Sequence, residues 1–286
     1  ALWTTAFSRK NTIGNRSVIQ RVTPEQMRAI QRQYYVPNNT ALILSGDITP
    51  ARGFQLAEQI FGDWPRGDDP FATPVPAPPP LTKSQAVVVE KPVNSVTLLI
   101  AWQGPRADQD TAATYAADVL STVLRNPTSK FHKRLIQSGL TFDSGISYYT
   151  QANVGPINAM LQTAPEKLLE AKQALLSEIA KLEDESYITD EELEAARSQL
   201  GIQALYERER TSEWAHTVGF WWAVTGLDYY RNYVPNMQKV SKADIARYAR
   251  MYLRGKPYVV GVLIDPKTRE ALKLTPATLL TPEVVP

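Results

Sequence analysis

The chain has 286 residues, of which 43% are hydrophobic and 21% are charged, a composition that suits one complete globular domain and a smaller additional piece. The net charge of +2, from 31 basic and 29 acidic residues, gives no field strong enough to favour nucleic acid or an anionic membrane as a partner. The absence of cysteine excludes disulfides, thiolate metal sites and a cysteine nucleophile, and no apolar run approaches the roughly 20 residues that a transmembrane helix needs.

The first helix signal lies near the N-terminus. Thr23 is a favourable N-cap, Pro24 suits the first helical position, and Gln26 completes a capping box. The apolar spacing predicts that this helix ends at Tyr34. The apolar run that follows predicts a strand over residues 40–45.

A further helix is expected from Pro50 to Gly62, because Thr49 suits an N-cap and glycine commonly ends helices. The composition then changes abruptly, since residues 63–84 contain seven prolines. Such a stretch favours an extended, polyproline-like conformation. We interpret it as a semi-rigid linker that marks a domain boundary.

The region 85–286 alternates strand and helix signals. We expect strands over 86–90, 95–102, 145–152 and 157–162, and helices over 110–124, 129–138, 166–182, 189–208 and around 214–222. Residues 153–156 predict a hairpin turn, and capping boxes are predicted at 163–166 and 189–192. Pairs of strands followed by runs of helices indicate an α+β fold, in which helices pack on one face of a mostly antiparallel sheet.

The helix and strand near the N-terminus recur near the C-terminus in the same register. The pairs Thr23/Ser241, Tyr34/Tyr252 and Asp47/Asp265 are each 218 residues apart. This repeat predicts a duplicated architecture with one partial and one complete unit. The first half of the partial unit would precede Ala1, together with any chemistry that it carries.

Candidate catalytic residues are scarce. The chain has two histidines, His132 and His216, and neither has a second histidine at helical spacing. No Gly-x-Ser-x-Gly elbow, phosphate-binding loop or dinucleotide motif is present. We expect His132 to be solvated on a basic helix and His216 to be partly buried beside tryptophans.

One concentration of aromatic residues remains as a candidate surface: Trp214, Trp221, Trp222, Tyr229, Tyr230 and Tyr233. Aromatic residues at helical spacing usually belong to a core. The alternative is a wall that packs against a partner domain or an extended peptide, since aromatic anchors are favoured at interfaces.

Several stretches together resemble the pitrilysin/insulinase family of inverse-zincin metallopeptidases. They are the sequence Tyr-Val-Pro-Asn-Asn at 35–39, Gly46-Asp47, the helix that ends at Gly62, and the region from Ser129 through the helix after Pro165. The resemblance implies that residues 1–62 are the C-terminal remnant of a first pitrilysin-like domain. Residues 85–286 would then form a complete second domain of the inactive type, joined to the first by the linker 63–84.

The catalytic residues of the family have no counterpart in this chain. In the family, zinc is bound by His-x-x-Glu-His and a downstream Glu of the first domain, and none of these corresponds to a position here. Some members add an Arg and a Tyr from a partner half, and the aligned positions are Ile157 and Leu168. The resemblance thus implies no catalytic residue, no metal ligand and no bound cofactor in this chain, with zinc in the parent enzyme or partner half.

The resemblance implies a non-catalytic portion of a bacterial zinc-dependent metalloendopeptidase, inactive by itself. It would form part of a clamshell chamber that encloses peptide substrates and part of the interface between the two halves. Its partner would be the zinc-bearing half, on the same polypeptide or a separate subunit. Two alternatives are a proteolytically dead scaffold or assembly subunit and a stand-alone peptide-binding module. The residues that bind substrate stay unidentified, and the family favours a periplasmic or envelope location.

Overall fold

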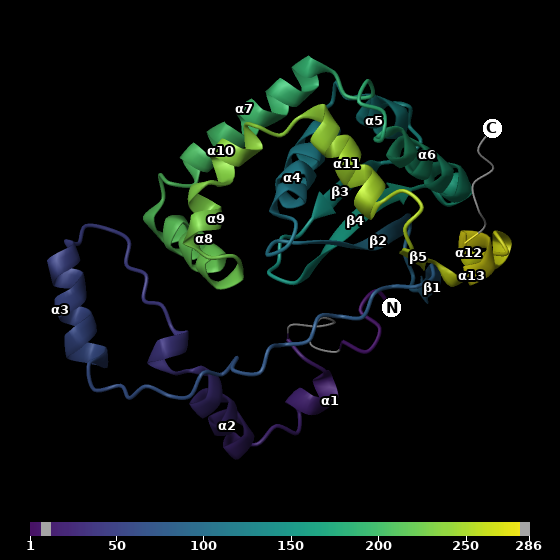
Figure 1. Cartoon of the computed structure of the whole chain (residues 1–286). Helices are drawn as coiled ribbons and strands as arrows, with labels where there is room; N and C mark the ends of the chain where they lie inside the picture. Colours follow the sequence, from purple (N-terminus) through teal and green to yellow (C-terminus); the bar gives the residue numbers. More distant parts are fainter. Residues whose placement is uncertain (7–12, 281–286) are drawn as a thin grey trace.

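The computed structural model describes residues 1–6 and 13–280 (Figure 1). Its N-terminal part contains α1 (Arg16–Ile19), α2 (Pro24–Tyr34), the 3₁₀ helix η2 (Pro37–Asn39) and α3 (Pro50–Phe61). The predicted capping box of α2 is present. The Thr23 hydroxyl accepts from the Gln26 amide N–H at 3.3 Å, and the Thr23 N–H donates to the Gln26 side chain at 2.9 Å.

The strand predicted over residues 40–45 is absent, and this stretch is irregular. Its copy 218 residues later is a strand, β5 (Val259–Ile264), which lies between two neighbouring strands. In the described part of the chain no strand pairs with residues 40–45, and a strand is held by hydrogen bonds to its neighbours. Ile43 lies instead against α8 (Thr211–Val224), where a Cβ added to Gly219 would be 3.2 Å from the Ile43 Cδ1 atom.

Residues 63–84 contain neither helix nor strand, but they are fixed at both ends. At one end the Asn38 side chain accepts a hydrogen bond from the Gly67 N–H at 3.0 Å. At the other end Gln103 donates to the Pro79 carbonyl at 3.0 Å and accepts from the Leu81 N–H at 3.0 Å. The linker is therefore held against both parts that it joins.

In the described residues, five strands form one sheet in the order β1-β5-β2-β4-β3. With β5 they are β1 (Gln85–Glu90), β2 (Val96–Arg106), β3 (Asp143–Tyr148) and β4 (Val154–Thr163). β1 and β5 pair in parallel, and the other neighbours pair antiparallel. The predicted α+β fold with a mostly antiparallel sheet is confirmed, and β3 is an edge strand.

The core lies between one face of this sheet and the helices α4 (Thr111–Arg125), α6 (Leu168–Lys181) and α11 (Lys242–Tyr252). Alternation along β2 directs Leu98, Ile100 and Trp102 into the core, where each is at most 1% exposed. On the opposite face Leu99 and Met160 are 39% and 38% exposed. Helices thus cover one face of the sheet, as predicted.

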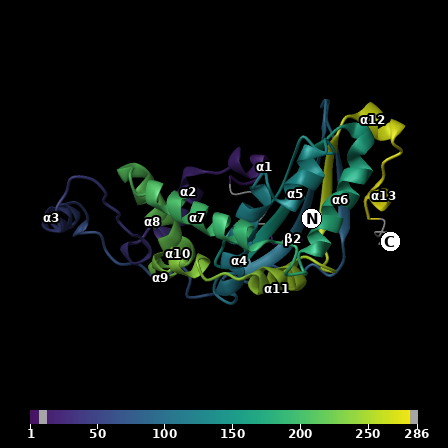
Figure 2. The ribbon, with the colours of Figure 1, turned by 90° about the horizontal axis from the view of Figure 1, so that it is seen from above.

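The remaining helices are α5 (Lys130–His132), the π-helical η3 (Lys133–Gln137), η4 (Pro165–Lys167), α7 (Asp190–Tyr206), α9 (Leu227–Arg231), α10 (Tyr233–Met237), α12 (Pro266–Ala271) and α13 (Pro276–Leu280). Helices α7 to α10 form an arm beside α4, and α3 lies at the opposite end of the molecule from α12 and α13 (Figures 1 and 2). Among the described residues, no helix combines the length and the apolar character that a bilayer span requires.

The predicted hairpin turn is displaced by a few residues. The turn lies at 149–153, because β4 already begins at Val154. Pro156 is inside β4, opposite Gln103, where the pairing with β2 shifts register before Arg106. Such an irregularity tolerates a residue that has no N–H for the ladder.

The capping box predicted at residues 163–166 is also wrong. Thr163 is the last residue of β4, and its hydroxyl donates to the Leu140 carbonyl at 2.8 Å. Ala164 occupies the N-cap position of η4 and makes no side-chain hydrogen bond. The Thr163 hydroxyl therefore bonds to a backbone carbonyl distant in sequence and does not cap the helix that follows it.

Candidate functional site

A hollow of about 660 Å³ runs along β3, an edge strand of the sheet. Its walls come from α4, α7 and α10 and from residues of β2 and β4. The small side chains of Ser144 and Gly145 on β3 leave room for it. Its polar lining includes Asp118, Ser121, Arg125, Asp143, Asn158 and Gln203.

Of the two acidic residues that line this hollow, Asp118 on α4 is partly buried and Asp143 on β3 is exposed. The Asp118 Oδ2 atom accepts a hydrogen bond from the Tyr233 hydroxyl of α10. Burial raises the pKa of Asp118 to about 6, although this hydrogen bond and the positive charge of Arg125 act in the opposite direction. Asp118 is therefore mostly ionised at neutral pH, in surroundings that disfavour its charge.

The aromatic residues of the arm pack on one another and on α4. The Tyr229 and Thr114 hydroxyls are hydrogen-bonded at 2.7 Å, and the Tyr229 ring stacks on Tyr115 with centroids 5.0 Å apart and on Trp221 with centroids 5.1 Å apart. Trp222 lies outside this stack and is 42% exposed. The aromatic group is thus neither a fully buried core nor a free wall, because it fixes the arm that borders the hollow.

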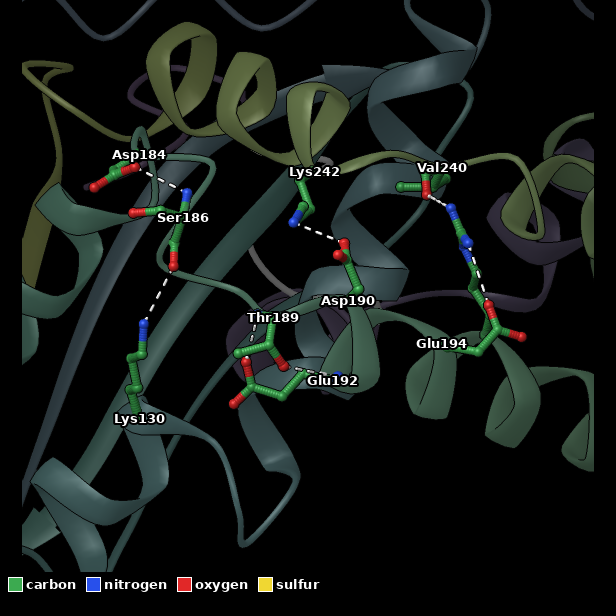
Figure 3. Close-up of polar contacts among 10 residues, drawn as sticks. Lys130, Asp184, Ser186, Thr189, Asp190, Glu192, Glu194, Val240 and Lys242 are labelled. Atoms are coloured by element: carbon green, nitrogen blue, oxygen red, sulfur yellow. Dashed lines mark hydrogen bonds and ion pairs between the residues drawn. The ribbon is translucent and has the colours of Figure 1, made fainter.

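Helix α7, another wall of the hollow, is anchored by polar contacts along its first half (Figure 3). Thr189 caps it through the predicted capping box. Lys242 of α11 forms an ion pair with Asp190 at 2.7 Å. Further along, the Arg197 guanidinium donates to the Val240 carbonyl. These contacts fix α7 relative to the helices that cover the sheet.

The two histidines lie on different elements, His132 on α5 and His216 on α8. His132 has intermediate exposure, whereas His216 is exposed, so the partly buried environment predicted for His216 is wrong. His216 is two positions from Trp214, which turns it towards another side of the helix. Within residues 1–6 and 13–280, no group of three or more His, Cys, Asp or Glu side chains is placed to hold a metal ion.

The two positions aligned with a substrate-binding pair are core positions. Ile157 on β4 and Leu168 on α6 are both 0% exposed. Their side chains pack in the hydrophobic core between sheet and helices. Neither side chain is available to a bound peptide.

Asp118 is the residue that the sequence analysis missed. It stands between Tyr115 and Val119, two buried residues of the amphipathic helix α4. A carboxylate on the apolar side of a helix is unusual, because ionised groups are seldom buried without a partner. The position of Asp118 among apolar residues could have marked it as unusual in the sequence. Its hydrogen-bond partner Tyr233 could not be predicted from spacing, because it is 115 residues away.

A profile of the family described as "Peptidase M16 inactive domain" matches residues 21–200 of this chain. No curated protein sequence matches the chain significantly. Among solved structures, the chain is similar to a protease from Helicobacter pylori, with a TM-score of 0.76 and 19% identity over 88% of this chain and 62% of that one.

Two further structures share the fold. The peptidase M16 inactive domain from Pseudomonas fluorescens has a TM-score of 0.73 and 20% identity, with 88% of this chain and 60% of that chain covered. A chain of Complex III2 from Candida albicans has a TM-score of 0.73 and 14% identity, with 94% and 64% covered. This chain spans about three fifths of the length of the solved structures that it matches.

Proposed function

This chain belongs to the peptidase M16 family through its inactive domain, and on that premise we propose that it is the non-catalytic portion of a zinc-dependent metalloendopeptidase. In this role it supplies part of the wall of a chamber that encloses peptides. The observation that carries the proposal is the hollow along β3, which has polar and apolar lining next to the partly exposed face of the sheet. Concave surfaces with both kinds of lining are typical of ligand sites.

The zinc of such an enzyme would be bound elsewhere. A zinc site needs three or four converging nitrogen, sulfur or carboxylate ligands, and the described residues do not fit one. When bound, zinc would polarise the peptide carbonyl and activate water. This chain would instead exclude solvent and restrict how a peptide lies in the chamber.

The N-terminal segment gives the chain a surface for its partner. Large apolar side chains of residues 1–62 are exposed, among them Met27, Ile30, Leu42 and Phe54. The corresponding helix α11 packs on α4, and the corresponding strand β5 is hydrogen-bonded between β1 and β2. We therefore propose that residues 1–62 complete a first domain together with a zinc-bearing polypeptide segment that provides such a sheet and helix.

Metal analysis and a peptidase assay test the proposal. The purified chain should hold far less than one zinc per molecule and cleave no peptide. Cleavage of a fluorogenic peptide should appear when the chain is combined with the segment or neighbouring gene product that carries His-x-x-Glu-His. One tightly bound zinc per chain, lost in His132→Ala or His216→Ala, would overturn it.

A scaffold role is the second candidate, because a chain of Complex III2 from Candida albicans has the same fold. A scaffold of this kind would bind its partner without any His-x-x-Glu-His segment in either protein. The same assay separates the two functions, since a stable complex without peptidase activity or zinc favours the scaffold.

A further inference from the structure

We propose that the hollow along β3 binds a lysine or arginine side chain of a peptide, with the Asp118 carboxylate as the counter-ion. The inference rests on the proposed chamber function, because it names the chemistry of the peptide that the chamber would receive.

Asp118 has a hydrogen-bond donor but no cation beside it. One carboxylate oxygen accepts from Tyr233, and among the described residues no Lys, Arg or His nitrogen lies within the 4.0 Å of an ion pair. Arg125, on the same helix, acts only at longer range, and its side chain is exposed at the rim. The second carboxylate oxygen therefore remains available to a donor in the hollow.

The charges around the hollow favour a cationic guest. Asp118, Asp143 and Arg125 are its charged lining residues, so carboxylates outnumber cations. Tyr229 and Tyr233 also face Asp118, and both stay neutral because burial, first of all, raises their pKa values. Helix α7 contributes uncharged side chains. At neutral pH the hollow thus carries a net negative charge that a cation would offset.

The lining fits a long side chain with a charged end better than a bare ion. Leu200 of α7 supplies apolar surface on the helix-covered side of the sheet, where Asp118 of α4 also lies, whereas Leu99 and Met160 line the part of the hollow on the opposite face. Lysine and arginine have an aliphatic stem that packs on apolar surface and a cationic head that needs hydrogen-bond acceptors. A metal ion would need more ligands than the two carboxylates of the hollow.

The test is a binding titration of the full chain at pH 7.5, by calorimetry or by NMR. The probes are the capped tripeptide acetyl-Ala-Lys-Ala-amide, the same peptide with norleucine in place of lysine, and n-butylammonium. We expect the lysine peptide to bind about tenfold more tightly than the norleucine peptide, as for one hydrogen bond between charged groups. Asp118→Asn should remove this difference, whereas Asp228→Asn, at an exposed position on α9 outside the hollow, should preserve it.

Two results with the peptides would overturn the inference, and a third with n-butylammonium would overturn its assignment to a peptide. One is equal affinity for the lysine and norleucine peptides, and the other is a preference for lysine that survives in Asp118→Asn. If n-butylammonium bound as tightly as the lysine peptide, the hollow would be a site for free alkylammonium ions and the assignment to a peptide would be wrong.

Loss of binding in Asp118→Asn would not result from misfolding, because this variant should keep or raise the melting temperature at pH 7.5. Since no cleavage is measured, failure here leaves the chamber function standing, and failure of the peptidase assay leaves charge-selective binding standing.

Discussion

Two aspartates of the same helix show how surroundings set the behaviour of one residue type. Asp110 caps α4 and receives hydrogen bonds from Arg247 at 2.9 Å and Tyr252 at 2.8 Å. Burial tends to raise its pKa, but these bonds outweigh burial and the net pKa is lowered. Asp118 lacks an adjacent cation, so burial prevails and its pKa is raised to about 6. Asp110 therefore stabilises the fold when ionised, whereas ionised Asp118 destabilises it.

The pH dependence of stability should separate these two aspartates. Between the ordinary pKa of 3.8 and about 6, the folded chain holds the Asp118 proton that the unfolded chain has lost. Raising the pH through this window therefore reduces the stability of the folded state. Asp118→Asn should melt at a higher temperature than the wild type at pH 7.5, and this advantage should disappear near pH 4. Calorimetric scans over this pH range measure the effect.

Asp110→Asn is the matched control with the opposite sign. The lowered pKa of Asp110 contributes stability that is present above its ordinary value and is lost as the pH falls. The variant should therefore melt below the wild type at neutral pH and approach it in acid. If Asp118→Asn also lost stability at neutral pH, the account of Asp118 as an unpaired charge would be wrong.

Helix starts were predictable wherever the partners are local. The capping boxes at Thr23 and Thr189 join residues three positions apart and are present as predicted. Prediction failed where the structure of a residue depends on a partner that is distant in the sequence. Thr163 bonds to the Leu140 carbonyl, residues 40–45 have no neighbouring strand in the described chain, and Asp118 depends on Tyr233. Sequence spacing thus gave the fold class and most helices, but not the polar site that forms between distant elements.

The two confirmed capping boxes should differ in energetic importance. Thr189→Ala should lower the free energy of unfolding by about 1 kcal/mol, because α7 buries Leu193 and Ala196 and contacts α4. Thr23→Ala removes the same hydrogen bond from α2, which has no buried residue. It should leave the main unfolding transition unchanged. Urea denaturation followed by tryptophan fluorescence measures both variants, and equal losses would show that α2 unfolds together with the sheet.

At the scale of the whole molecule, the hydrophobic core is confined to one part of the chain. The residues of the main core cluster run from Val96 to Leu279, and none of them precedes the linker. Val36 and Leu81 are buried but lie outside this cluster. Few contacts link the two parts, among them Gln103 with the Leu2 carbonyl at 3.1 Å. The described residues thus place the core in the proposed second domain, while residues 1–62 expose their apolar faces.

A fragment of residues 78–286 should therefore fold without the N-terminal part. It keeps the whole core cluster and the hydrogen bond between Leu81 and Gln103. We expect its melting temperature to lie within about 3 °C of the full chain, a shift that corresponds to roughly 1 kcal/mol for a domain of this size. Limited proteolysis of the full chain should cut first in residues 63–84, which have no helix or strand, and release a stable fragment of this length. A fragment that fails to fold, or that melts far below the full chain, would show that residues 1–77 belong to the same cooperative unit and that the domain boundary is wrongly placed.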